Sequence, residues 1–251
     1  MNNIKTCFII ALKYYRDKPT HIKEYVNNIN KFYTDSFILI VNNNSEFIED
    51  IQFDYKNVII ITNTTDCKFE LGAYIFGIKY ILKTNIADNF NYFVFTQDTF
   101  ILHNKYDFNN LLENEVTACP IVTSCPGTFS QDLKDCMLHH RTHKNRYLIK
   151  FVIMRLGLTD SIPELTFCFA NSFILEKSKL NKFIELTEYI KITNKVQSES
   201  SERFLAGVLY LLNNRKNTSI EKKIVNDFMN DILVGNSIYF EYFVKFIYGK
   251  K

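Results

Sequence analysis

The sequence is poor in glycine and has no long apolar run. Only 7 of its 251 residues are glycine. A Walker-type phosphate loop or a GxGxxG dinucleotide-binding motif therefore has few residues from which to be built, and neither motif is present. The apolar runs are short, as at residues 36–41 and 58–61, whereas a membrane-spanning helix needs about 18–20 apolar residues. These absences exclude the two glycine-rich nucleotide-binding motifs and predict no transmembrane segment.

An excess of charge of one sign is also lacking. The chain has 30 Lys and Arg against 27 Asp and Glu, so its formal net charge is +3. Nucleic acids and anionic membranes select strongly basic surfaces, so this balance predicts no nucleic-acid partner. The 6 cysteines are scattered along a chain without a signal peptide, which favours free thiols in a reducing compartment over a disulfide framework. We therefore expect a soluble cytoplasmic protein.

The first hundred residues alternate apolar runs with helical periodicity. Strands are predicted at residues 7–12, 37–41, 58–62 and 92–96, and helices at residues 20–33, with Thr20 as N-cap, and 70–83. This order predicts an α/β fold, with a mostly parallel, Rossmann-like sheet flanked by helices. Ligands of such sheets bind outside the carboxyl ends of the strands, so we expect the chemistry there.

The later part of the chain is less regular. Its composition predicts a strand at 167–175, a helix at 179–188, a polar loop at 194–201 and an amphipathic helix at 202–212. We expect one domain over residues 1–215, with residues 216–251 as a helical C-terminal extension packed on it. The aromatic C-terminal end has a second interpretation as a segment that rests on a membrane, but packing on the core is the commoner role of such a segment.

Short motifs stand at the ends of two predicted strands and at the start of the predicted helix at 70–83. Residues 41–45 read Val-Asn-Asn-Asn-Ser, residues 70–73 read Glu-Leu-Gly-Ala, and residues 96–98 read Thr-Gln-Asp. In order, these motifs resemble those of the nucleotide-sugar-dependent glycosyltransferases of the GT-A fold. The likeness is greatest to enzymes of giant DNA viruses and of bacterial polysaccharide synthesis. The resemblance spans about residues 4–212, and a viral origin would place the protein in the host cytoplasm.

The resemblance implies a hexosyltransferase-like enzyme that uses a nucleotide-diphosphate sugar as donor and a glycan or glycoprotein as acceptor. The family's Asp-x-Asp motif holds a divalent cation, and here Thr96-Gln97-Asp98 keeps only the second carboxylate. Asp98 is therefore the implied ligand of Mn²⁺ or Mg²⁺. The implied donor-binding residues are Ala11, Leu12, Asn42, Asn44, Glu70, Gly72, Gln97 and Asp98.

The family's catalytic base is an Asp or Glu at the start of a later helix. Residues 199–205 read Glu-Ser-Ser-Glu-Arg-Phe-Leu, which implies Glu202 as base, with Glu199 as the second candidate and Asp132 or Asp135 after it. An inverting transfer needs such a carboxylate to accept the proton of the attacking hydroxyl. A plain alternative is that Glu202 complements the helix dipole in a first turn capped by Ser201.

Each candidate has a structural alternative. Asp98 and the asparagines of residues 42–44 are also common turn formers, and Glu70 is also a helix-dipole acid. Cys136, His139, His140 and His143 have two i, i+4 spacings but no established zinc motif, so a solvated basic patch or contacts to an anionic substrate are favoured over zinc.

The sequence allows one other function and disfavours a second. Because the first carboxylate of the Asp-x-Asp motif is missing, the chain can instead be a decayed GT-A scaffold that binds nucleotide or glycan without turnover. A Rossmann-type methyltransferase is disfavoured, because no glycine-rich turn follows the first strand.

Overall fold

The computed structural model describes residues 4–12, 21–43, 45, 51–125, 168–216, 218–224 and 238–245. Its first half contains β1 (Thr6–Leu12), α1 (Ile22–Phe32), β2 (Phe37–Asn42), β3 (Val58–Thr62), α2 (Phe69–Lys83), the 3-10 turn η2 (Ile86–Asn89), β4 (Tyr92–Gln97), β5 (Phe100–Leu102) and α3 (Asn109–Glu113). It continues with β6 (Ala118–Pro120), β7 (Val122–Cys125), η3 (Phe169–Asn171), β8 (Phe173–Glu176), η4 (Lys177–Lys179), α6 (Leu180–Thr187), α7 (Lys195–Leu212), β9 (Glu221–Ile224), β10 (Ile238–Tyr239) and β11 (Phe243–Lys245).

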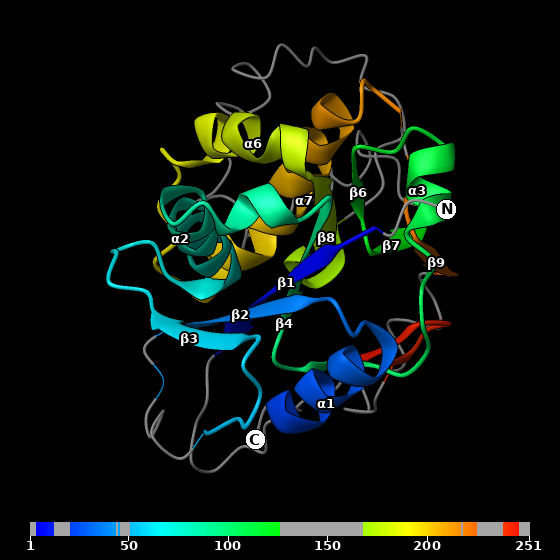
Figure 1. Cartoon of the computed structure of the whole chain (residues 1–251). Coiled ribbons are helices and arrows are strands. Elements are labelled where there is room, and N and C mark those ends of the chain that lie inside the picture. The colour runs from blue at the N-terminus through cyan, green and yellow to red at the C-terminus, as the bar shows by residue number, and fades with distance from the viewer. Residues whose placement is uncertain are drawn as a thin grey trace.

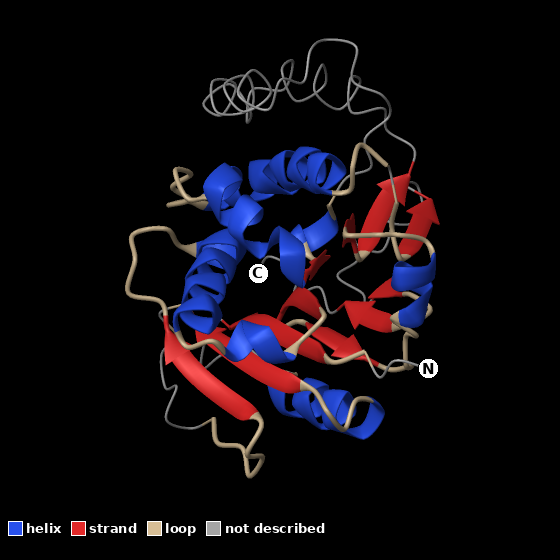
Figure 2. Cartoon of the chain, turned by 45° about the horizontal axis from the view of Figure 1, so that its top comes forward, coloured by secondary structure: helices blue, strands red, loops and turns tan. Residues whose placement is uncertain are grey.

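The main sheet has six strands in the order β3-β2-β1-β4-β8-β6. The first four are parallel, and β8 runs antiparallel to both β4 and β6. Figure 1 shows α1 on one side of this sheet and α2, α6 and α7 on the other. Figure 2 shows helices on both faces from a second direction. The predicted α/β fold with a mostly parallel, helix-flanked sheet is therefore confirmed.

The two faces of β1 belong to two different cores. Cys7, Ile9 and Ala11 pack with α2, α6 and α7, whereas Phe8, Ile10 and Leu12 pack with α1. Side chains alternate between the faces of a strand, so a strand covered on both faces must be apolar at every position. This requirement explains why the apolar run at residues 7–12 predicts β1 well.

The predicted helix starts need correction. The N-cap of α1 is His21 rather than Thr20, which lies outside the described residues. Helix α7 begins at Lys195, so the predicted polar loop at 194–201 is wrong. The side chain of Asn194 accepts a hydrogen bond from the backbone N–H of Gln197 at 3.0 Å, and the Gln197 side chain accepts one from the N–H of Thr193 at 2.8 Å. This reciprocal capping starts the helix one to two turns before the apolar periodicity becomes visible.

The C-terminal segment also differs from its prediction. Its described residues form the strands β9, β10 and β11 rather than helices. Strand β9 pairs with β7, and β11 pairs with β5 and β10. The aromatic and β-branched residues of β10 and β11 favour extended backbone, and β11 supplies main-chain hydrogen bonds by pairing with β5 on one side and with β10 on the other. Among the described residues, no helix has the length and apolar character needed to cross a bilayer.

Four described cysteines, Cys7, Cys67, Cys119 and Cys168, are free thiols. Burial raises the pKa of Cys119 to about 12, and it also raises the pKa values of Cys7 and Cys168, the latter helped by the nearby charge of Glu202. Unfolded thiols ionise near pH 8.5, so the stability that these neutral thiols contribute is present below that pH and lost as the pH rises.

The free energy of unfolding is therefore expected to fall above pH 8.5, by about 1.4 kcal/mol per pH unit for each buried thiol. Urea denaturation at pH 7.5 and pH 9.5 measures this slope. Cys119→Ala should make this pH dependence smaller. The slope depends on the number of protons released on unfolding, and the packing lost with the thiol does not change it. Leu112→Ala, at a position 54% exposed, should leave it unchanged. An equal slope in the wild type and Cys119→Ala would contradict the expectation.

Candidate functional site

The carboxyl ends of the central parallel strands meet at one edge of the sheet and enclose a small cavity. The strand order places β2 on one side of β1 and β4 on the other, and the helix α1 that connects β1 to β2 lies on the opposite face from the helix α2 that connects β3 to β4. Such a switch point is where open α/β sheets bind ligands. A cavity of about 50 Å³ lies here, and its lining consists of Ala11, Leu12, Asn43, Phe69, Glu70, Gln97 and Asp98. Five of these seven residues are among those predicted from sequence.

Asparagine side chains hold the loops that follow β2 and β3. Asn42 accepts a hydrogen bond from the N–H of Ser45 at 2.8 Å and donates a long one to Thr62 at 3.4 Å. Asn43 donates to the carbonyl of Phe69, and Asn63 donates to the Asn43 side-chain oxygen at 2.9 Å. Asn42 thus secures its own turn, whereas Asn43 lines the cavity.

The first turn of α2 approaches the cavity in an unusual conformation. Phe69 has a φ of 60°, which costs free energy for a bulky residue and is typical of functional sites. The next residue, Glu70, accepts a hydrogen bond from Ser198 of α7 at 2.7 Å. At Gly72 a side chain is excluded, because a Cβ atom there would overlap the Cys67 carbonyl. The position of Glu70 is therefore held by its hydrogen bond to Ser198 and by the close packing of Gly72 against the Cys67 carbonyl.

Gln97 and Asp98 extend from the end of β4 into the same cavity. Asp98 is 9% exposed, and its backbone N–H donates to the carbonyl of Ala11 at 3.0 Å. The Gln97 amide donates to the carbonyl of Ala170 at 2.7 Å. Ala170 and Asn171 both have a φ of 52°, so a second strained segment lies against this edge.

Glu202 lies in the interior of α7 and not in its first turn, so the sequence prediction that Ser201 caps the helix is wrong. Ser201 instead donates to the carbonyl of Ser198 and to the side chain of Asn171, at 2.6 and 2.9 Å. Glu202 is half-buried beside Cys168 and does not line the cavity of Asp98. It follows Ser198 by four residues, so the two side chains lie on the same helix face, one turn apart.

The carboxylate oxygens around the cavity are of the ligand type that a hard cation prefers. Glu70 and Asp98 supply carboxylates, and Mn²⁺ or Mg²⁺ prefers such ligands. No group of three or more His, Cys, Asp or Glu side chains gathers among the described residues. The cation would therefore draw on these two carboxylates together with the substrate's own oxygens.

Several predicted residues lie outside the described part of the chain. They are Asn44, Asp132, Asp135 and the group of Cys136, His139, His140 and His143. The side chain of Glu199 is likewise outside the described part of α7. Sequence reasoning missed Asn43, Asn63, Phe69 and Ser198. The only sequence signal for Asn43 was its place in the asparagine cluster of residues 42–44. A strand-end motif does not show which of two adjacent side chains points into the cavity.

The Glu70–Ser198 contact is expected to stabilise the site measurably. Removing the hydroxyl in Ser198→Ala should cost about 1.5–3 kcal/mol, the usual range for a hydrogen bond to a charged group. A double-mutant cycle with Glu70→Gln, read by urea denaturation, isolates the coupling between the two side chains. The exposed Lys182–Glu185 pair, at 2.7 Å, provides the control, with a coupling of about 0.5 kcal/mol or less. Equal couplings for the two pairs would contradict this interpretation.

Comparisons with known proteins give no family assignment. No protein-family model matches the chain, and no curated protein matches it with significant sequence similarity.

Proposed function

We propose that this protein is a glycosyltransferase with a GT-A-like fold, which moves a sugar from a nucleotide-diphosphate donor to a glycan or glycoprotein acceptor. The observation that carries the proposal is the cavity that Asp98 and Glu70 share at the switch point of the parallel strands. Sugar diphosphates are commonly held through a divalent cation, and this cavity offers carboxylates where an α/β sheet binds nucleotides.

In this mechanism the acceptor hydroxyl attacks the anomeric carbon of the donor. The new glycosidic bond forms as the bond between that carbon and the diphosphate oxygen breaks, and the electron pair leaves with the nucleoside diphosphate. Asp98, through Mn²⁺ or Mg²⁺, would stabilise the charge on that leaving group. The base and ribose would contact Ala11, Leu12 and the asparagine turn.

Glu202 is the proposed base that accepts the proton of the acceptor hydroxyl. Its support is positional: Glu202 stands one helical turn from Ser198, and Ser198 contacts Glu70 of the donor cavity. Helix α7 thus contacts the cavity through Glu70, which lines it. We expect the acceptor to lie between Glu202 and Asp98.

A decayed scaffold that binds nucleotide or glycan without turnover is the second candidate. The specific observation in its favour is Thr96, which stands where the family has its first carboxylate, is fully buried, and shares a hydrogen bond of 2.9 Å with the Tyr25 hydroxyl. A hydroxyl in this position bonds within the core and supplies no negative charge to a cation.

Ligand-induced stabilisation is the first test. Melting temperatures are measured with UDP, GDP, CDP and dTDP and their sugars, each with and without Mn²⁺. A ligand at 100 times its dissociation constant stabilises the fold by about 2.7 kcal/mol, or roughly 5–10 °C for a chain of this size. A shift with one nucleotide that grows with Mn²⁺ supports the proposal. A shift without metal dependence removes the metal role of Asp98, and no shift with any nucleotide overturns the donor site.

Turnover separates the enzyme from the binding scaffold. Asp98→Ala and Glu202→Ala should each lower sugar transfer about 100-fold or more, measured as release of nucleoside diphosphate. Asp88→Ala is the matched control, because Asp88 is an exposed carboxylate paired with Lys177 at 2.8 Å, and it should leave the rate unchanged. A wild type that binds nucleotide but shows no transfer would favour the scaffold.

A further inference from the structure

A second, larger cavity lies at the opposite edge of the parallel sheet. It has a volume of about 410 Å³, within the roughly 300–1,000 Å³ typical of small-molecule sites. Its walls come from the start of β1, from the turn between α1 and β2, and from residues 105–109 before and at the start of α3. Strand β1 separates it from the cavity of Asp98 by about 20 Å, since a strand rises about 3.3 Å per residue. The two cavities are therefore separate sites.

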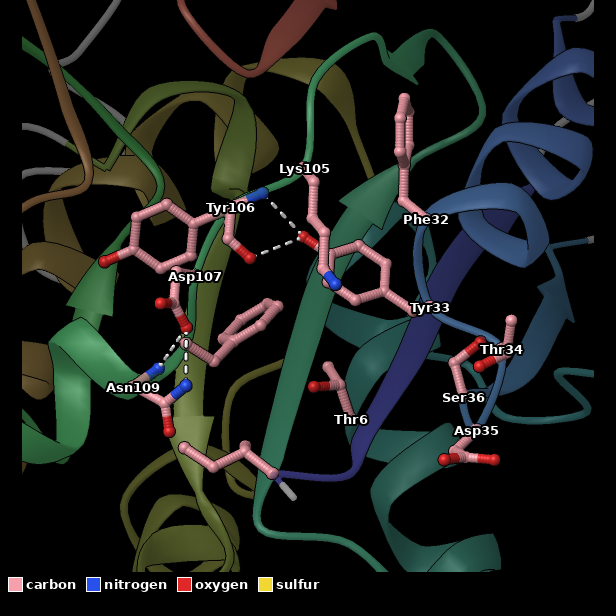
Figure 3. A pocket seen from close by; sticks show the side chains of 12 residues that line it. Thr6, Phe32, Tyr33, Thr34, Asp35, Ser36, Lys105, Tyr106, Asp107 and Asn109 are labelled. Atoms are coloured by element: carbon pink, nitrogen blue, oxygen red, sulfur yellow. Dashed lines mark hydrogen bonds between the residues drawn. The ribbon is translucent and has the colours of Figure 1, made fainter. Parts of the chain in front are cut away.

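Two buried hydroxyl groups in the wall of this cavity have no hydrogen-bond partner. Thr6 is 2% exposed and Ser36 is 6% exposed, and neither side-chain oxygen makes a hydrogen bond in the structure. Both residues line the cavity, and Figure 3 shows Thr6 near the centre of the group. A buried hydroxyl without a partner costs free energy, and a ligand that offers its own hydroxyl groups would remove that cost.

The cavity is held open by hydrogen bonds among its own walls. The hydroxyl of Tyr33 accepts from the backbone N–H of Tyr106 at 2.8 Å and donates to the Tyr106 carbonyl at 2.9 Å, as the dashed lines in Figure 3 show. Asp107 accepts from the backbone and the side-chain amide of Asn109, at 3.0 and 2.7 Å. These bonds fix the turn after α1 against residues 105–109 before any ligand arrives. Such preorganisation lowers the free-energy cost of binding.

The charges at the cavity argue against an anionic or a purely apolar ligand. Asp35 and Asp107 contribute two carboxylates, and the one cation among the described residues of the lining is Lys105. The Lys105 ammonium lies 5.9 Å from the centroid of the Tyr33 ring. A phosphate or a nucleotide would meet net negative charge here, and a lipid chain would leave the hydroxyl, carboxylate and amide groups unpaired.

We propose that this cavity binds a neutral polyhydroxylated molecule, that is, a mono- or disaccharide. Sugar hydroxyls both donate and accept, so they match the hydroxyls of Thr6 and Ser36, the Asp107 carboxylate and the Asn109 amide. The apolar C–H face of a sugar ring fits the half-buried side of Phe32. The site is independent of the proposed sugar transfer, because none of its lining residues belongs to the cavity of Asp98.

A fluorescent reporter tests the proposal directly. The chain contains no tryptophan, so Phe32→Trp places a single tryptophan at the cavity. Its emission should change saturably with glucose, galactose, mannose or lactose. It should not change with inorganic phosphate, spermidine or choline. Tyr55→Trp, at an exposed position outside the lining, should not respond to any of them. Melting temperatures of the unmodified protein with the same compounds provide a second readout that needs no tryptophan.

Variants then show whether the sugar lies where we propose. In the Phe32→Trp background, Thr6→Val should weaken saccharide binding by roughly 3–10-fold, the effect of one net hydrogen bond, and Asn109→Ala should act similarly. Tyr74→Phe is the matched control, because Tyr74 also carries a buried hydroxyl without a partner but does not line this cavity. It should leave binding unchanged, as should Asp98→Ala.

Three results would overturn the proposal. The first is no response to any saccharide at concentrations up to about 100 times a millimolar dissociation constant. The second is a response to the charged compounds in place of the sugars. The third is loss of saccharide binding in Asp98→Ala, which would locate the sugar in the cavity of Asp98. Nucleotide binding is measured separately in Thr6→Val. Its retention there, whatever the saccharide result, keeps a failure of this site distinct from a failure of the proposed transferase.

Discussion

Gly72→Ala is expected to destabilise the protein by about 3 kcal/mol or more, which lowers the melting temperature of a chain of this size by roughly 6–12 °C. A Cβ atom at residue 72 would overlap the carbonyl oxygen of Cys67. That carbonyl has little freedom to move, because Asn63 donates to it at 2.9 Å and Thr65 donates to it at 3.2 Å. Relief of the overlap must therefore shift the start of α2 or break the loop after β3.

Gly77→Ala is the matched control in the same helix. Its added Cβ would lie 3.0 Å from the Cγ2 methyl groups of Ile9 and Val41, which belong to side chains and not to fixed backbone. Alanine also improves helix propensity by about 1 kcal/mol over glycine. The net change in the free energy of unfolding should stay within about 1 kcal/mol. Thermal unfolding of both variants measures the two changes in the free energy of unfolding. Similar losses of stability at the two positions would show that the Cys67 carbonyl is not the obstacle.

Nucleotide binding should also weaken in Gly72→Ala beyond what the loss of stability explains. Glu70 lies two residues before Gly72, and its contact with Ser198 joins α2 to α7. A shift of the first turn of α2 would move Glu70 and the strained Phe69 relative to Asp98. Unchanged nucleotide affinity in the folded fraction of Gly72→Ala would argue that this turn takes no part in the site.

The parallel half of the sheet could be predicted because each of its strands is marked by its own run of residues. A strand buried on both faces must be apolar throughout, and the run of residues 7–12 shows this directly. The pairing partners of β5 and β7 could not be predicted in this way. They pair with β11 and β9, far along the chain, over three and four residues respectively. So short a pairing leaves no periodicity in the sequence.

The position of the candidate site followed from a rule about strand ends, and its details did not. The rule brought Ala11, Glu70, Gln97 and Asp98 to one cavity. It could not choose between Asn42 and Asn43, since adjacent residues in extended backbone point to opposite sides. It also could not find Ser198, because the contact with Glu70 joins residues 128 positions apart.

The second, larger cavity, lined by Thr6 and Ser36, could not be predicted from the strand-end rule. Its walls come from three separate segments, near residues 6, 35 and 107, and none of them carries a recognisable motif. Thr6 looks like the polar start of a strand, and Ser36 like a turn residue. Only the structure shows that both hydroxyls are buried without a partner at one cavity.

Phe95→Ala is expected to cost about 3–5 kcal/mol, the usual range for a fully buried phenylalanine. The Phe95 ring stacks on Phe173 with 4.4 Å between centroids, and its edge-to-face partner is Tyr74 at 5.4 Å. The ring therefore joins β4 to β8 and to α2, at the place where the parallel part of the sheet meets its antiparallel part. Its removal leaves a cavity that Phe173 and Tyr74 cannot fill, because each is itself fully buried.

Urea denaturation of Phe95→Ala, Phe95→Leu and Leu112→Ala measures this contribution. Phe95→Leu keeps most of the apolar volume and should lose only about 1–1.5 kcal/mol. Leu112→Ala, at an exposed position, should change the free energy by about 0.5 kcal/mol or less. Phe95 precedes Gln97 by two residues on the same strand, so a loosened ring stack should also weaken nucleotide binding at Asp98. If Phe95→Ala lost no more stability than Phe95→Leu, the site would depend on the loops and helix ends around it, and not on the aromatic core beneath β4.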